Sequence, residues 1–189
     1  MLKMTNKNGL TIVEILVAVT IIALLAAGLY SVSNYLEKQA KIKLTESTIE
    51  ALSAAIEQYR DFNGHFPFVT GTGSYGLSQL QTTLNGTVVN PTDYNDIYAS
   101  SDALYYILNQ VPASKKIIDN LNRSLVTNKD YKGTEYFILI NGVNYPLIHI
   151  IDPWKCPLRY TYKDSDNFPL IESTGPDRDF NTPDDISSR

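Results

Sequence analysis

Carboxylates near the C-terminus are the residues of this chain best suited to chemistry. The stretch from Ser173 to Ile186 holds four aspartates within nine positions, and Gly175, Pro176 and Pro183 interrupt it. Glycine and proline exclude a helix here. Ca²⁺ binds six to eight hard oxygen ligands, and carboxylates on a turning loop supply them. The spacing lacks the sixth-position glycine and the final glutamate of an EF-hand. Two interpretations stay open, a calcium loop and an acidic disordered tail, and composition alone slightly favours the tail.

Glu14 is the other notable carboxylate, because it lies inside an apolar stretch. The segment from Leu10 to Tyr30 has about the 20 residues that an α-helix needs to cross a membrane, and Glu14 is its one charge. A charged side chain within a membrane helix costs about 2.5–3.5 kcal/mol on insertion scales, so it normally has a partner. A carboxylate that snorkels to the membrane surface is the alternative.

The residues before the apolar stretch set its orientation. They include Lys3 and Lys7 and no acid, and positive charge stays on the cytoplasmic side of a membrane. An ordinary secretory signal has a shorter apolar run followed by small residues and a cleavage site, and the segment after Tyr30 fits that pattern weakly. We therefore expect a leader over residues 1–9, a retained membrane helix over 10–32 and a globular domain over 33–189.

The sequence Gly9-Leu10-Thr11-Ile12-Val13-Glu14 resembles the processing motif of type IV pilins and type II secretion pseudopilins. Leu10 stands where most members have phenylalanine. The resemblance implies that prepilin peptidase cuts between Gly9 and Leu10, and that the new α-amino group of Leu10 is methylated. It also implies that the carboxylate of Glu14 acts in assembly. Pairing with the Leu10 amino group of a neighbouring copy would offset the desolvation of both charges.

The elements downstream are those that would position a C-terminal loop. Apolar spacing predicts one helix from about Thr11 to Arg60, ending near Phe62, with Asn63-Gly64 as its stop. The resemblance to the pilin family fades over about residues 85–134, which we interpret as a family-variable insertion with helices at 102–109 and 115–125. A hairpin turning at Asn141-Gly142 is expected over 135–151, with Pro146 at a sheet edge or a bulge. Further strands are expected at 158–162 and 168–172. The predicted fold class is α+β: a long N-terminal helix packed on one small antiparallel sheet.

The end of the long helix with its turn at Phe66-Pro67, followed by Gly76-Leu77, resembles the major pseudopilin of type II secretion systems. Two further segments carry the same resemblance. They are Asp152-Pro153-Trp154, whose tryptophan is expected in the core, and the SxGPDxxFxTxDDI pattern at the C-terminus. The resemblance implies the type IV pilin fold with a C-terminal loop that binds structural calcium. Its implied ligands are Asp177, Asp184 and Asp185 with the backbone carbonyls of Thr174 and Ser188; Asp179 is the next candidate.

The implied function is that of a structural subunit of the type II secretion pseudopilus. The implied partners are further copies of the chain, minor pseudopilins, prepilin peptidase and the assembly platform of the bacterial inner membrane. The domain after the helix would be periplasmic. A type IV pilin or minor pilin in adhesion, motility or DNA uptake is the alternative. The calcium-type loop, in place of a C-terminal disulfide, favours secretion.

Composition bears on other function classes. The formal net charge of −4 and the isoelectric point near 5.1 disfavour nucleic acid as a ligand. Cys156 is the single cysteine, which excludes an intrachain disulfide, and we expect it to be a small buried residue. His65 and His149 have no evident serine or cysteine partner and are expected to be structural, so no enzyme is predicted. An enzyme or solute-binding protein on a pilin-type anchor would need a pocket formed by residues 85–131.

Overall fold

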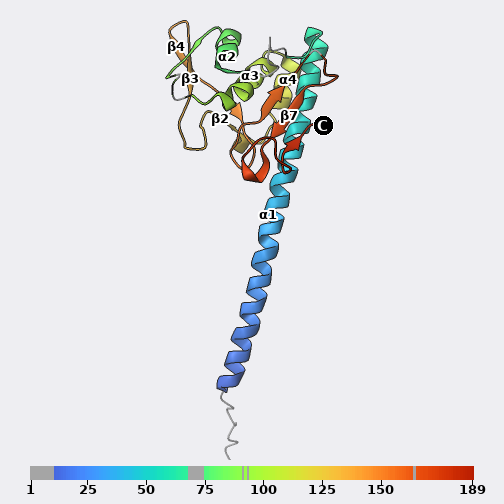
Figure 1. Ribbon diagram of the computed structural model, residues 1–189, viewed down its shortest axis with the longest axis vertical. Helices are drawn as coiled ribbons and strands as arrows, with labels where there is room; N and C mark the ends of the chain where they lie inside the picture. Colours follow the sequence, from blue (N-terminus) through green and yellow to red (C-terminus); the bar gives the residue numbers. More distant parts are fainter. Residues whose placement is uncertain (1–10, 68–74, 91, 93, 164) are drawn as a thin grey trace, which may run out of the picture. The chain divides into compact units, whose positions relative to one another are not determined.

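A computed structural model describes residues 11–67, 75–90, 92, 94–163 and 165–189. The chain forms two compact units, Met1–Ala40 and Lys41–Arg189. One helix, α1 (Ile12–Asn63), contributes residues to both. Figure 1 gives the element labels used below.

Between Ile15 and Tyr30, α1 in the first unit is apolar on every side, with Thr20 as the one polar residue. Apart from Gln39, every side chain described between Thr11 and Ala40 is exposed. A helix that is apolar all round is stable only in an apolar environment. Among the described residues, α1 is the one helix long and apolar enough to cross a membrane.

In the second unit, α1 is amphipathic. Its buried stripe consists of Thr45, Thr48, Ile49, Leu52, Ala55 and Ile56. These positions recur every three or four residues, as the side of a helix that faces a core requires. The helix ends where the backbone amide of Gly64, at φ +79°, donates to the carbonyl of Arg60 over 2.7 Å. The predicted helix and its glycine stop are confirmed.

In the described part of the chain, three shorter helices follow: α2 (Leu77–Leu84), α3 (Ala99–Leu108) and α4 (Pro112–Ile118). Single 3₁₀ turns cover Asp96–Tyr98 and Arg123–Leu125. The helix predicted at 102–109 begins three residues later than α3. The predicted helix over 115–125 is wrong at both ends, because Pro112 occupies the first turn of α4, where its missing N–H costs nothing. The separate turn over Arg123–Leu125 accounts for the rest of that prediction.

The strands form three small antiparallel sheets among the described residues, where one was predicted. The first has the order β1 (Thr87–Val88), β3 (Phe137–Ile140), β4 (Val143–Pro146). The second pairs β2 (Val126–Thr127) with β5 (His149–Ile150). The third has the order β6 (Arg159–Thr161), β7 (Leu170–Ser173), β8 (Ile186–Ser187).

The hairpin around Asn141-Gly142 is confirmed, with Ile140 opposite Val143. Its second strand ends at Pro146 rather than continuing to residue 151, because β5 leaves to pair with β2. Pro146 lies in β4, at the edge of its sheet. An edge strand tolerates a residue that has no N–H to donate.

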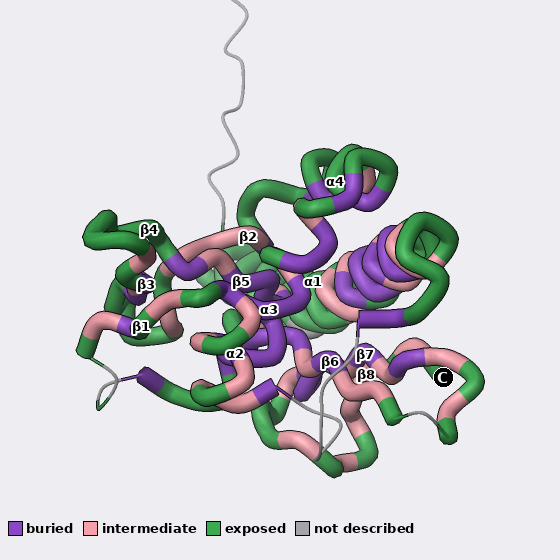
Figure 2. Tube along the Cα trace, turned by 90° about the horizontal axis from the view of Figure 1, so that it is seen from above, coloured by how far each residue is buried: buried purple, intermediate pink, exposed green. Residues whose placement is uncertain are grey.

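Helix α3 bonds to strands of two of the three sheets. The hydroxyl of Ser101 donates to the carbonyl of Ile150 over 2.9 Å and accepts from its amide over 2.7 Å. The hydroxyl of Ser100 does the same for Tyr160, at 2.8 and 2.7 Å. Both serines are buried, so backbone groups of β5 and β6 bond to α3 in addition to their strand partners. Figure 2 shows α3 buried near the middle of the second unit.

Residues 85–134 therefore supply part of the core. Tyr94, Tyr98, Ala103, Leu104 and Leu108 are all buried in it, together with Leu52 and Ile56 of α1. Trp154, which was expected in the core, is only half-buried. Its turn is held by Asp152, as described below, rather than by packing of the indole ring.

Candidate functional site

Glu14 lies in the first turn of α1 and closes the start of the helix. Its Oε2 atom accepts from the backbone amide of Thr11 over 2.8 Å and from the Thr11 hydroxyl over 2.9 Å. The Glu14 amide donates to the Thr11 hydroxyl over 3.2 Å. This reciprocal arrangement is a capping box, which satisfies amides that have no partner within the helix. The T-x-x-E spacing of residues 11–14 could have revealed this role from the sequence.

The capping box leaves part of the Glu14 carboxylate open. Both contacts made with Thr11 use Oε2, and Oε1 accepts no hydrogen bond among the described residues. A carboxylate can accept about four hydrogen bonds. Gly9 and Leu10, the predicted processing residues, lie outside the described residues.

The C-terminal aspartates lie on a folded loop. After β7, a 3₁₀ turn at Gly175–Asp177 leads into left-handed residues at Arg178 and Asn181. The amide of Asp177 donates to Oδ2 of Asp184 over 3.2 Å. The Thr182 hydroxyl donates to Oδ1 of Asp184 over 2.8 Å, and this bond lowers the pKa of Asp184 below its ordinary value. The loop therefore returns on itself and favours the charged form of that aspartate.

The other candidate ligands lie at different distances from the contact between Asp177 and Asp184. Asp185 accepts from the Asn181 amide over 2.7 Å, beside Asp184 in sequence. Asp179 donates its amide to Oδ1 of Asp177 over 2.9 Å. Ser188 lies further away along the strand pair, because its amide donates to the carbonyl of Ile171, three residues before Thr174. The loop between β7 and β8 thus holds Thr174, Asp177, Asp184 and Asp185, whereas Ser188 follows β8 and lies beside Ile171.

Gly175 makes this loop possible. Its φ of +65° is in the left-handed region, and a β-carbon added there would lie 2.2 Å from the carbonyl oxygen of Asp184. No side chain can occupy that space without moving the backbone. Glycine allows the Gly175–Asp177 turn and the segment at Asp184 to touch.

Asp152 fastens the start of the loop to the Asp152-Pro153-Trp154 turn. Its Oδ1 accepts from the amides of Trp154 and Cys156, both over 2.9 Å. Its Oδ2 accepts from the hydroxyls of Ser173 and Thr174, over 2.7 and 3.4 Å. Burial raises the pKa of Asp152, and these four hydrogen bonds offset part of that rise. A second attachment is the guanidinium of Arg159, which lies 3.9 Å from the centre of the Phe180 ring and pairs with Glu172.

Within the part of the chain that the structure describes, no three His, Cys, Asp or Glu side chains are grouped to hold one metal ion. The aspartates instead use their oxygens to organise the loop backbone. Cys156 is half-buried, and burial raises the pKa of its thiol, which makes it a weak nucleophile.

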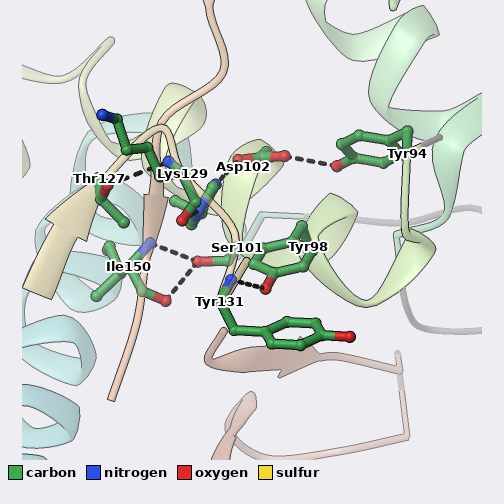
Figure 3. Close-up of polar contacts among 9 residues, drawn as sticks. Tyr94, Tyr98, Ser101, Asp102, Thr127, Lys129, Tyr131 and Ile150 are labelled. Carbon is green, nitrogen blue, oxygen red and sulfur yellow. Dashed lines mark hydrogen bonds and ion pairs between the residues drawn. The ribbon is translucent and has the colours of Figure 1, made fainter. Parts of the chain in front are cut away.

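His149 belongs to a buried polar network, part of which Figure 3 shows. Its Nδ1 lies 3.1 Å from Oδ1 of Asp102, and its Nε2 lies 2.9 Å from the carbonyl of Lys129. The Tyr94 hydroxyl donates to the other Asp102 oxygen over 2.5 Å. The His149 ring also packs on that of Tyr98, with centroids 4.7 Å apart. Both ring nitrogens are engaged and the side chain is fully buried, so the network fastens α3 to β5 and presents no group to a substrate.

His65 is exposed, and its Nδ1 lies 2.8 Å from the carbonyl of Phe66. Its ring meets that of Tyr59 edge to face, with centroids 6.1 Å apart. These contacts indicate a structural role for His65 at the C-terminal end of α1. The two histidines lie in separate environments and share no partner among the described residues.

Comparison with known proteins supplies one match. Residues 4–30 match the family model described as the prokaryotic N-terminal methylation motif. Neither the search of curated proteins nor that of solved structures gives a match to the chain. The matched segment contains Gly9, Leu10 and Glu14 and most of the apolar part of α1. The chain therefore carries at its N-terminus the methylation motif that is the signal of type IV pilin-like proteins.

Proposed function

We propose that this chain is a structural subunit of a type II secretion pseudopilus, held in the bacterial inner membrane by α1 until it is assembled. The observation that carries the proposal is the methylation motif over residues 4–30 on a helix that is apolar on every side. Prepilin peptidase would cut between Gly9 and Leu10 on the cytoplasmic side and methylate Leu10. The second unit would then lie in the periplasm.

In the filament, the apolar part of α1 would exchange lipid for the same helix of other copies. The charge of Glu14 would be buried there, and a buried carboxylate needs a partner of opposite charge. The α-amino group of Leu10 on a neighbouring copy supplies that charge. The Oε1 atom supports this pairing, because it accepts no hydrogen bond among the described residues and the capping box with Thr11 engages only Oε2.

The C-terminal loop is the reason to favour secretion over a surface pilin. We propose that it binds a structural calcium ion through Asp177, Asp184 and Asp185 and the carbonyl of Thr174. The contact between Asp177 and Asp184 supports this, since it already joins the two ends of the loop. The resemblance implies the carbonyl of Ser188 as a fifth ligand, but Ser188 lies beside Ile171, three residues before Thr174. Calcium would supply the charge that the aspartates need to approach more closely.

Further partners follow from the same proposal: minor pseudopilins at the filament tip and the assembly platform in the inner membrane. A type IV pilin or minor pilin would share the N-terminal motif. It would differ in having its filaments on the cell surface, whereas pseudopilus subunits support export of other proteins.

Glu14→Gln in the full chain tests the assembly role separately from helix capping. Glutamine at this position keeps the capping box and removes the charge. In cells that contain the processing and assembly proteins, we expect the variant to be processed but to lose most of its filaments, measured as the sedimentable fraction after mechanical shearing. Thr11→Ala, which weakens the cap and keeps the charge, is the matched control and should assemble. Normal filaments from Glu14→Gln would contradict the pairing.

A further inference from the structure

The exposed side of α1 in the second unit carries an acidic stripe. Glu46, Glu50 and Glu57 are spaced by four and seven residues, which places them in one row along the helix. The row is about 16 Å long at 1.5 Å per residue. Among the described residues, none of the three forms an ion pair or a hydrogen bond, so their carboxylates are open to an outside partner.

A groove runs along this stripe, beside the end of β8. It has a volume of about 450 Å³ and is lined by the three glutamates, by Ser53, Ser187 and Ser188, and by the apolar Ile49 and Ala54. We call it the acidic groove. Carboxylates and serine hydroxyls all accept hydrogen bonds, so the groove suits a row of N–H donors with positive charge.

A second hollow on the same unit has the opposite charge. It has a volume of about 410 Å³, lies around the segment that joins β2 to β3, and contains Lys129, Lys132 and Lys155. All three lysines are exposed. We call it the lysine surface. Tyr131 adds an exposed aromatic ring, which lies 5.4 Å from the ammonium of Lys132.

Acidic residues near the lysine surface do not cancel its charge. Glu135 pairs with Lys129 over 3.1 Å. Asp130 is turned toward its own loop, where it accepts from the amides of Lys132 and Thr134, both over 2.8 Å. Neither acid pairs with Lys132 or Lys155 among the described residues. Two ammonium groups therefore remain available to an outside partner.

The two surfaces lie on different sides of the second unit. The acidic groove follows α1, whereas the segment between β2 and β3 lies on the side away from α1 (Figure 1). Two complementary surfaces on different sides of one subunit join copies head to tail, and such contacts continue as a filament unless rotation closes a ring.

We propose that the acidic groove of one copy receives the lysine surface of the next copy in the filament. This inference rests on the proposed function and names the residues that join the globular units. Flexible lysine side chains can reach into the groove toward Glu50 and its neighbours. Exposed charge pairs contribute more to register and partner choice than to affinity, so this contact sets how consecutive copies are rotated. The apolar part of α1 supplies most of the cohesion.

A carbodiimide that joins a carboxylate to an adjacent amine tests the contact in wild-type filaments. We expect cross-linked peptides that join Glu46, Glu50 or Glu57 to Lys129, Lys132 or Lys155, found by mass spectrometry in filaments and absent from unassembled chains. Cross-links that avoid these carboxylates in intact wild-type filaments overturn the inference and leave the proposed function standing. Wild-type chains that are neither processed nor assembled overturn both.

Charge reversal in the full chain provides the second measurement. Glu50→Lys and Lys155→Glu should each reduce the sedimentable filament fraction at least several-fold, and the double variant should recover most of it. Lys116→Glu is the control, since Lys116 is exposed on α4, outside both surfaces. The inference is overturned if the double variant loses as much of the sedimentable filament fraction as the two single variants lose together. It is also overturned if Lys116→Glu reduces that fraction as much as Glu50→Lys or Lys155→Glu does.

Discussion

Gly175→Ala gives a sharp test of how the C-terminal loop is built. Gly175 combines a φ of +65° with a position where a β-carbon would lie 2.2 Å from the carbonyl oxygen of Asp184 and 3.4 Å from its carboxylate. Alanine would therefore push the Asp184 segment away from the turn at Gly175–Asp177. The same movement would lengthen the bond from the Asp177 amide to Asp184.

Two costs add at this position. An alanine in left-handed backbone costs about 1–2 kcal/mol relative to glycine. Relief of the overlap requires the backbone to move by about 1 Å, and overpacking of this kind typically costs about 1–3 kcal/mol. We therefore expect the free energy of unfolding to fall by about 2–5 kcal/mol. For a domain of this size the melting temperature would fall by about 5–20 °C.

Gly133→Ala is the matched control. Gly133 has a φ of +87°, but a β-carbon there meets no atom within 4 Å, so only the conformational cost of about 1–2 kcal/mol applies. Thermal unfolding followed by circular dichroism should be measured on the fragment Lys41–Arg189, which contains every residue of the hydrophobic core found in the described part of the chain. Equal losses for the two variants would refute the close approach of Gly175 and Asp184.

Two further predictions concern solution conditions. If the loop binds calcium, saturating calcium should raise the melting temperature of the same fragment by several degrees, because ligand at 100 times its dissociation constant adds about 2.7 kcal/mol to the free energy of unfolding. Asp184→Asn and Asp185→Asn should abolish this rise. An identical melting temperature with calcium and with a chelator would contradict the site. Partial burial tends to raise the pKa of Asp130, but hydrogen bonds from the amides of Thr134 and Lys132 bring it below the ordinary 3.8. The carboxylate form therefore stabilises the fold above pH 3.8, and this contribution is lost as the pH falls through the lowered pKa. Asp130→Asn should thus be less stable than wild type at pH 7, and denaturant titrations should show the difference shrinking in acid; a difference independent of pH would contradict this.

Local sequence signals were sufficient where an element depends on its own residues. The length of α1 follows from apolar spacing, and its end follows from Gly64. The tight turn at Asn141-Gly142 and the edge position of Pro146 follow from backbone properties of those residues alone. The capping role of Glu14 was readable from Thr11 in the same way, although the sequence reasoning assigned Glu14 only to assembly.

Features that depend on distant residues could not be predicted. Helix α3 joins two of the sheets because Ser100 and Ser101 bond to the backbone of Tyr160 and Ile150, which are 49 residues or more away in the chain. No local pattern distinguishes these serines from exposed ones. The half-buried position of Trp154 likewise depends on Asp152, whose oxygens are used by Ser173 and Thr174.

In the candidate loop, too, some features follow from local sequence and others depend on distant residues. Its aspartates were evident from composition, and Gly175 was expected only as a helix breaker. The contact of Gly175 with Asp184 and the position of Ser188 beside Ile171 depend on the pairing of β7 with β8. The sequence thus identified the loop, and the strand register decides which of its oxygens lie together.

The most direct measurement of the central proposal is the mass of the N-terminal peptide of the chain recovered from filaments. We predict a peptide that begins at Leu10 and carries one methyl group on its α-amine, with residues 1–9 removed after Gly9. An unmodified Met1 in assembled filaments would contradict the proposal.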